Sequence, residues 1–131
     1  MAGKVVLQGS LGRALYGVLA LLFPKLLLRG VGMNEVDLGA DARYFNRLFG
    51  GRDLLVAGAS VAAVRRGAVK DAIATNIVCE VTDSISMVEE IRARGSFDRM
   101  TAIGLAFNVV GYATWTRAAL ALRADEPTPA T

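Results

Sequence analysis

The stretch that decides the fold is residues 43–60, which reads RYFNRLFGGRDLLVAGAS. Aromatic side chains and two arginines spaced i, i+4 come first, a double glycine follows, and an Arg-Asp pair then opens an apolar run. Aromatic rings and arginines on a short amphipathic helix suit the headgroup level of a bilayer. We therefore expect a short interfacial helix over 42–49, a hinge at Gly50-Gly51 and a membrane helix that starts at Arg52.

Further apolar segments flank this stretch on both sides. The first of them is apolar all round a helix and is closed by Pro24, because proline disfavours helix at the residue before it. The expected long helices cover residues 7–23, 52–64, 71–92 and 100–122, and of these only the last contains a charge-free run near span length, 100–116. The predicted fold is all-α: four transmembrane helices in a bundle, plus the short interfacial amphipathic helix between helices 1 and 2.

Length and composition favour one membrane domain. The chain has 131 residues, 53% of them hydrophobic and 21% charged, and its mean hydropathy is +0.42. This is more apolar than an average soluble domain, and a chain this small cannot easily bury the excess in water. We expect residues 1–122 to form the membrane domain and 123–131 to be a polar, disordered tail.

Charged residues inside the apolar segments leave a soluble alternative open. Arg13, Arg52-Asp53, Glu80 and Asp83 all fall within expected helices, and charges in spans are rare and usually face a bundle interior or a partner. A soluble four-helix bundle explains the third segment, which has one apolar and one polar face, but not the first or the fourth. We expect a multi-pass protein of the cell membrane, with both termini on the cytoplasmic side because the 65–70 loop is compact and basic.

Several classes of chemistry are excluded by composition. The chain has no histidine and one cysteine, Cys79, so His-based catalysis and an internal disulfide are impossible. The net charge of +3 is scattered over segment ends without a Lys/Arg-rich block, which excludes a nucleic-acid footprint. Two carboxylates alone cannot complete a Mg²⁺ or Ca²⁺ shell. We expect no enzyme activity, no cofactor and no metal.

The charged candidate site residues lie at the start of the second segment and near the middle of the third. Glu80 and Asp83 are spaced i, i+3, so their carboxylates point the same way. They could serve proton relay or cation coordination, or they could form a structural ion pair with Arg52 or Arg47. Arg52-Asp53 could likewise bind a lipid phosphate or anchor the second helix. Because an unpaired arginine near hydrocarbon is costly, we predict that Arg52 contacts Glu80 or Asp83.

Small residues mark the expected packing faces. Gly58 and Ala62 have the small-xxx-small spacing that lets helix backbones approach closely, and Gly104 and Gly111 lie on one stripe of the fourth segment. Asn108 lies on that same stripe, where we expect it to form hydrogen bonds between helices rather than to bind a ligand.

The order of these features resembles a family of small four-helix bacterial and fungal membrane proteins known as a domain of unknown function. The resemblance rests on Pro24, Gly32-Met33, the RLFGGRD stretch at 47–53, Gly58 and the acidic Asp83, and covers roughly residues 10–120. It implies a bacterial or fungal four-span bundle and no assigned activity. Cys79 and Glu80 are not part of the pattern.

Three functions follow as expectations. The leading one is a non-enzymatic accessory or scaffold subunit that packs against a larger membrane complex or against itself. The alternative is a protein that binds or transports a lipid or small molecule in a polar cavity at Arg52, Glu80 and Asp83. The third is a soluble four-helix interaction module.

Overall fold

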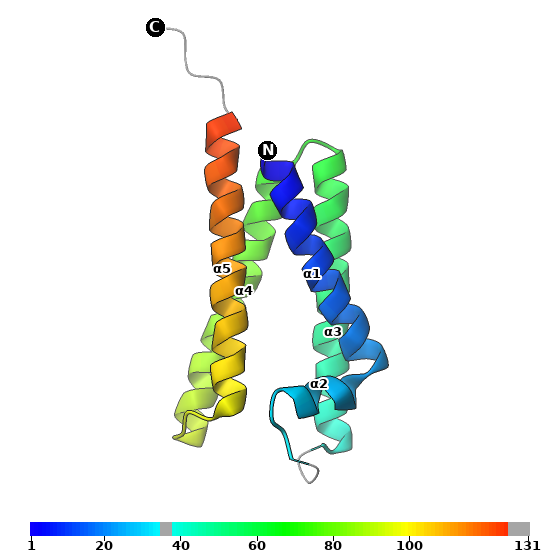
Figure 1. Cartoon of the computed structure of the whole chain (residues 1–131), viewed down its shortest axis with the longest axis vertical. Helices are drawn as coiled ribbons and strands as arrows, with labels where there is room; N and C mark the ends of the chain where they lie inside the picture. Colours follow the sequence, from blue (N-terminus) through cyan, green and yellow to red (C-terminus); the bar gives the residue numbers. More distant parts are fainter. Residues whose placement is uncertain (35–37, 126–131) are drawn as a thin grey trace, which may run out of the picture.

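The computed structural model describes residues 1–34 and 38–125, and within these ranges it contains five α-helices and no strand (Figure 1). The helices are α1 (Ala2–Leu22), α2 (Pro24–Gly30), α3 (Ala40–Arg65), α4 (Val69–Arg94) and α5 (Arg99–Asp125). The predicted all-helical class is confirmed, with four long helices and one short one.

The helix ends follow local chemistry. Pro24 begins α2, where the N–H that proline lacks would have no acceptor within the helix. Gly95 ends α4 with φ +62°, a left-handed conformation that glycine adopts without steric cost. Asp98 then caps α5, because its Oδ1 accepts the backbone N–H of Thr101 at 2.9 Å.

The glycine pair in the middle of α3 is not a hinge. The helix runs without a break from Ala40 to Arg65, so the prediction of a separate interfacial helix over 42–49 is wrong. The reason is packing: a β-carbon on Gly50 would lie 2.7 Å from the Ala20 Cβ and 2.8 Å from the Gly17 carbonyl oxygen. Gly50 therefore lets α1 cross α3 at close range, and the short helix of the fold is α2 instead.

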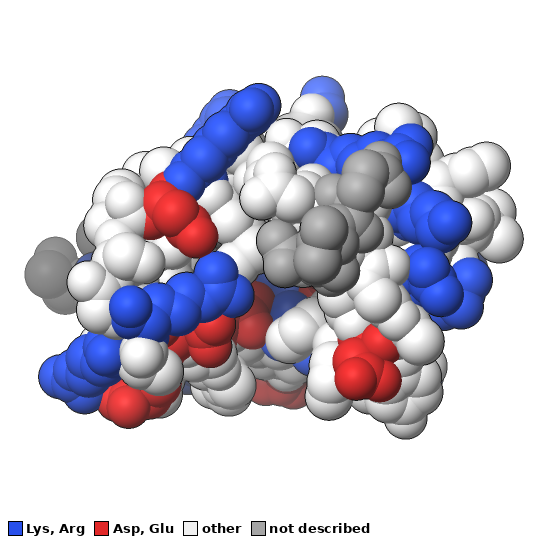
Figure 2. Space-filling model, turned by 90° about the horizontal axis from the view of Figure 1, so that it is seen from below, with Lys and Arg blue, Asp and Glu red and all other residues white. Residues whose placement is uncertain are grey.

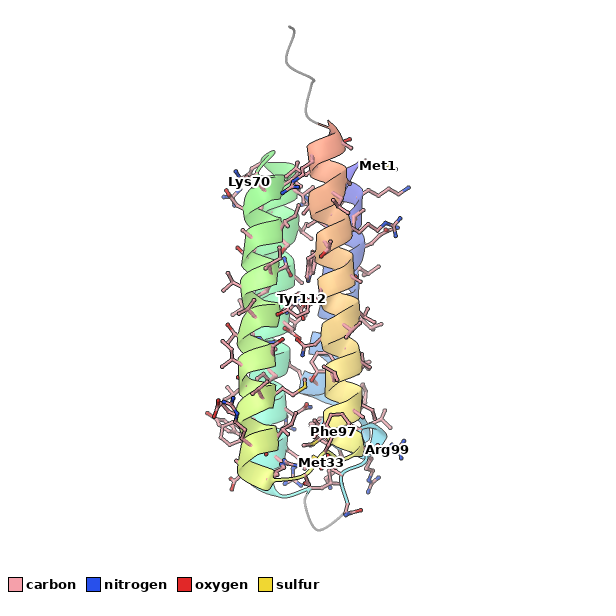
Figure 3. All side chains as sticks on the ribbon, turned by 90° about the vertical axis from the view of Figure 1, so that its left-hand side faces the viewer. Met1, Met33, Lys70, Phe97, Arg99 and Tyr112 are labelled. Carbon is pink, nitrogen blue, oxygen red and sulfur yellow. The ribbon has the colours of Figure 1, made fainter. Side chains whose placement is uncertain are left out.

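The long helices form two pairs that meet at one end. Helix α1 packs on α3 and α4 packs on α5, and the pairs diverge toward the lower end of Figure 1. Figure 3 shows Met1 and Lys70 at the upper end, Tyr112 near mid-height, and Met33, Phe97 and Arg99 at the lower end. The apolar core comes from the first turns of α1 and α4 and the last part of α5, and comprises Val5, Val6, Ala72, Ile73, Trp115 and Ala118.

Outside this apolar core, the distribution of polarity is inverted relative to a water-soluble bundle. On α4, Asn76 and Glu80 are buried, whereas Val78 is 63% exposed and Ile85 is 60% exposed. A soluble amphipathic helix shows the opposite pattern, with its apolar stripe facing the core. The other long helices follow α4: their exposed side chains include Leu11, Leu55, Phe107 and Val109, and their buried ones include Ser10, Ser60 and Asn108.

By length and composition alone, α1 is the helix among the described residues that could cross a membrane. The sequence had favoured residues 100–116 as the charge-free span, and α1 instead meets the criterion despite Arg13. A single such helix near the N-terminus does not establish a membrane location, because signal sequences and buried core helices meet it too. The four predicted spans are thus confirmed only as four long helices.

The end of α5 also differs from prediction. The helix continues past Leu122 to Asp125, because residues 123–125 are helical rather than part of a tail. The remainder of the predicted tail, 126–131, lies outside the described residues.

Candidate functional site

An arginine of α1 lies at the centre of a buried ionic cluster. Arg13 donates from Nη1 to Asp53 Oδ1 at 2.8 Å and from Nη2 to Glu80 Oε1 at 2.5 Å. The three side chains are only 9–10% exposed. This bridge joins α1, α3 and α4 through charge-assisted hydrogen bonds, the strong class of hydrogen bond in proteins.

A second arginine extends the cluster along α3. Arg52 donates to Asp83 from both terminal nitrogens, Nη1 to Oδ1 at 2.5 Å and Nη2 to Oδ2 at 2.9 Å. Its Nη2 also lies 3.1 Å from Asp53 Oδ1, which links the two arginines through one carboxylate. The prediction that Arg52 contacts Glu80 or Asp83 is confirmed, with Asp83 as the partner.

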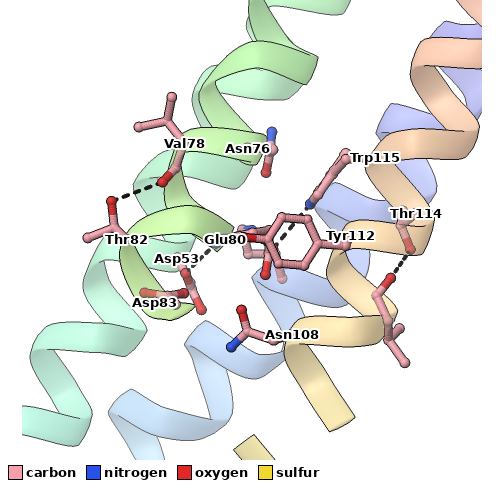
Figure 4. Close-up of polar contacts among 12 residues, drawn as sticks. Asp53, Asn76, Val78, Glu80, Thr82, Asp83, Asn108, Tyr112, Thr114 and Trp115 are labelled. Atoms are coloured by element: carbon pink, nitrogen blue, oxygen red, sulfur yellow. Dashed lines mark hydrogen bonds and ion pairs between the residues drawn. The ribbon is translucent and has the colours of Figure 1, made fainter. Parts of the chain in front are cut away.

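The tryptophan of α5 completes the cluster from the other side. Trp115 is 2% exposed and donates its indole N–H to Glu80 Oε1 at 3.1 Å, as Figure 4 shows. Two glycines make room for this contact. A β-carbon on Gly9 would lie 2.6 Å from the Trp115 ring, and one on Gly111 would overlap the Glu80 carboxylate. All four long helices therefore contribute to the cluster or to its immediate packing.

A neutral polar network lies beside the charges between α4 and α5. Ser84 donates to Asn108 Oδ1 at 3.0 Å, and its hydroxyl lies 3.1 Å from the Tyr112 hydroxyl. The prediction that Asn108 forms hydrogen bonds between helices is confirmed. Asn76 donates to Ser60 at 2.7 Å and ties α4 to α3 in the same way.

The cluster forms one wall of a cavity of about 840 Å³ between the two helix pairs. We call this cavity the α1–α5 cleft, because exposed residues of α1 and α5, including Gln8, Phe107 and Val110, line it and leave it open on that side. In Figure 2, charged side chains are visible at the floor of a hollow between two halves of the molecule. Its size lies within the range of small-molecule pockets.

The lining of the cleft has two parts of different character. One consists of the charged groups Arg13, Arg52, Asp53, Glu80 and Asp83. Much of the remaining lining is apolar and includes Met87, Phe107 and Val110, with glycines at positions 12 and 104. Such an arrangement can hold a molecule that is apolar along most of its length and polar at one end.

The predicted site residues fall into two groups. Arg52, Asp53, Glu80, Asp83 and Asn108 all line the cleft. Arg47 does not join them: it is exposed and donates to the Leu21 carbonyl oxygen at 3.3 Å. Of the two arginines named as alternative partners of the carboxylates, Arg52 forms the pair and Arg47 does not, because the unbroken α3 places Arg47 on a different face from Arg52.

The predicted packing residues also divide. Gly104 and Gly111 line the cleft and pack inside the bundle, Gly104 against Met87 and Gly111 against Glu80. Gly58 faces open space within the described chain. Packing of Gly58 and Ala62 against another protein stays a prediction.

Sequence reasoning missed Arg13 and Trp115 as members of the site. The signal for Arg13 was available, since it is the one charge in the middle of the first apolar segment, and such charges usually face a bundle interior. Trp115 offered no such signal, because a single tryptophan in a sequence is as compatible with a buried core position as with a membrane–water interface.

No protein-family model, no curated protein and no solved structure matches the chain. The resemblance to a family of small four-helix membrane proteins therefore stays a prediction, and the geometry of the cleft carries the functional argument.

Proposed function

We propose that the chain is a four-span integral membrane protein that binds a lipid or another amphiphilic small molecule in the α1–α5 cleft. The observation that carries this proposal is the cleft itself, whose lining combines a cluster of charged groups with many apolar side chains. This is the function that the sequence suggested as an alternative to a scaffold subunit.

The inverted polarity of the bundle supports a membrane location. Large apolar side chains such as Leu11 and Leu55 are 72% and 76% exposed, while Asp53 and Glu80 are 7% exposed. Exposed apolar surface on this scale is rare on monomeric soluble proteins. Charged groups in a membrane are expected to face the bundle interior and to pair with one another, and Arg13, Asp53 and Glu80 do both.

Helix length is consistent with four spans. Helices α3 and α4 have 26 residues each and α5 has 27, which at 1.5 Å per residue is roughly 40 Å. A hydrocarbon core of about 30 Å needs about 20 residues. The hydropathy averaged over α3 or α4 is lowered by charged residues, among them Arg52, Asp53, Glu80 and Asp83. These four side chains line the cleft inside the bundle, so they would not meet lipid tails.

The membrane location can be tested by alkaline carbonate extraction of membranes that contain the protein. We expect it to stay in the pellet with integral proteins. Release into the supernatant would favour the soluble interaction module and would overturn the proposal.

Ligand binding can be tested by filling the cleft without disturbing the fold. Gly12 lines the cleft, and a β-carbon there would meet no atom within 4 Å. Gly51 offers the same open space on α3 but does not line the cleft. Gly12→Leu and Gly51→Leu therefore form a matched pair, in which only the first places a side chain in the cleft.

The readout is native mass spectrometry of protein purified in a mild detergent, with a lipid extract of the host membrane added back. We expect bound lipid or amphiphile on the wild type and on Gly51→Leu, and its loss on Gly12→Leu. Equal binding by both variants would place the ligand elsewhere, and no bound mass on the wild type would count against a ligand-binding function.

A second candidate function is favoured by a groove on the outside of the bundle. Leu7, Leu11, Leu54, Gly58 and Val61 line an apolar hollow of about 540 Å³ between α1 and α3. A helix of a larger membrane complex could pack there, as the scaffold prediction requires, because Gly58 permits close approach of a backbone. In a pull-down from native membranes, Gly58→Leu should then lose the partner, while Gly12→Leu should keep it.

A further inference from the structure

We infer that the ligand of the α1–α5 cleft is an amphiphilic cation, with a protonated amine or similar group on an apolar body. This inference rests on the proposed function and specifies the chemical class of its ligand. It is carried by the charge count and the hydrogen-bonding state of the buried cluster.

The cluster contains more negative than positive groups. Three carboxylates, Asp53, Glu80 and Asp83, face two guanidinium groups, Arg13 and Arg52. Both terminal nitrogens of each arginine already contact carboxylate oxygens. The formal charge of the cluster is therefore negative, and an added cation would balance it where an added anion would not.

Two acceptor atoms of the cluster have no donor. Asp53 and Glu80 use one oxygen each, Oδ1 and Oε1, for all of their hydrogen bonds. Their other oxygens, Oδ2 and Oε2, receive none from any described residue, although the side chains are only 10% and 9% exposed. An ionised carboxylate can accept about four hydrogen bonds, so these two oxygens keep accepting capacity for a molecule in the cleft. A ligand that brings N–H donors and positive charge would satisfy both conditions.

The position of Glu80 makes it the primary contact. Its carboxylate lies over Gly111, and both residues line the cleft. The aromatic rings of Tyr16, Phe49, Phe107 and Trp115 also line it. Aromatic faces attract cations, and more strongly where water is excluded.

One positive group of the cleft stands apart from this cluster. Arg117 also lines the cleft, but it is exposed and takes no part in the ion pairs that join Arg13 and Arg52 to the three carboxylates. If Arg117 instead recruited the ligand, an anionic amphiphile would bind best, which the experiment below would reveal.

The chain carries its own reporter for this experiment. Trp115 is its single tryptophan, and it donates directly to Glu80. A ligand cation at Glu80 should therefore change the emission of Trp115. The probes are dodecylamine, dodecanol and dodecanoate, which share one alkyl chain and differ in charge, titrated at about pH 7 into protein in uncharged detergent micelles.

We expect a saturable emission change with dodecylamine at a concentration about tenfold or more below any change with the other two probes, as a hydrogen bond to a charged group implies. Equal binding of the amine and the alcohol would overturn the inference on charge but leave the proposed amphiphile site intact. Tightest binding of dodecanoate would also overturn it. Binding of none of the three would count against the proposed function itself.

A matched pair of variants assigns the effect to Glu80. Glu80→Gln keeps an oxygen that can accept the Trp115 N–H but removes the charge, and should weaken amine binding about tenfold or more. Glu89→Gln makes the same change on the exposed part of α4, where Glu89 pairs with Arg92 at 2.7 Å, and should leave binding unchanged. Equal amine affinity in wild type and Glu80→Gln would overturn the assignment. The three-probe comparison on the wild type tests the inference even if Glu80→Gln does not fold.

Discussion

The carboxylate of Glu80 occupies the space that a β-carbon on Gly111 would fill, so the two residues fit together only because one of them has no side chain. Gly111→Ala should push the carboxylate away and lengthen its hydrogen bonds with Arg13 and Trp115. Overpacking of this kind costs about 1–3 kcal/mol. Thermal unfolding in detergent, followed by Trp115 emission, would measure the loss as a lower melting temperature.

Gly104→Ala is the control for that change. It adds the same methyl group to the same helix, but the nearest atom is the flexible Met87 Cε at 3.2 Å. Its melting temperature should stay near that of the wild type. If both variants melt alike, the close fit between Gly111 and Glu80 does not matter for stability.

Removal of Arg13 should be the most damaging single change in the bundle. Arg13→Met leaves Glu80 without its guanidinium partner, and loss of one partner of a buried pair costs about 3–5 kcal/mol. Chemical denaturation in micelles would measure it. Arg92→Met, at a pair whose side chains are 70% and 64% exposed, should cost at most about 1 kcal/mol.

A double variant separates the lost charge balance from the lost packing. Arg13→Met combined with Glu80→Gln removes both charges, and Asp53 keeps its contact with Arg52 at 3.1 Å. The double variant should therefore be more stable than Arg13→Met alone. If the stability loss of the double variant equals the sum of the losses of Arg13→Met and Glu80→Gln alone, the Arg13–Glu80 contact contributes little.

Two adjacent glycines of α3 should respond oppositely to alanine. At Gly50 the added methyl group would lie 2.7 Å from Ala20 Cβ and close to the Gly17 backbone, which should cost about 1–3 kcal/mol. At Gly51 it would meet no atom within 4 Å, so the higher helix propensity of alanine should stabilise the protein by up to about 1 kcal/mol. Melting temperatures of both variants would show this difference. Equal destabilisation of both would instead support the hinge at Gly50-Gly51 that the sequence suggested.

The loop between α4 and α5 should give the protein an acid-sensitive step. The backbone N–H and the hydroxyl of Thr101 both donate to Asp98 Oδ1 at 2.9 Å, and these bonds, with the nearby Arg94, lower the pKa of Asp98 below its ordinary value of 3.8. A carboxyl whose pKa is lowered by folding stabilises the fold fully above the unfolded value. That contribution is lost as the pH falls through the folded value.

Asp98→Asn tests this step, because asparagine can still accept the Thr101 N–H but does not titrate. Melting temperatures measured from about pH 6 down to about pH 2 should fall less steeply for the variant than for the wild type. Parallel curves would show that Asp98 does not contribute to the acid sensitivity.

The sequence predicted the parts of the fold that depend on local chemistry. Pro24 separated α1 from the next segment, and the spacing of Glu80 and Asp83 with the cost of an unpaired arginine led to the contact between Arg52 and Asp83. The break at Gly50-Gly51 was wrong, because a local pattern cannot tell a flexible glycine from one that is required by a helix crossing 30 residues away in the chain, near Ala20. The cleft could not be predicted either, since it depends on how far apart the two helix pairs lie.

The unequal ends of the bundle have a consequence for its internal motion. The apolar contacts of Val6, Ile73 and Ala118 hold the upper end together, whereas the helix pairs diverge at the lower end. Local opening needs less free energy where fewer apolar contacts must be broken. Backbone amides of α4 and α5 near Gly95 should therefore exchange with deuterium sooner than those near Ala72 and Ala118, and the ionic cluster should mark the boundary between a slowly and a rapidly exchanging half.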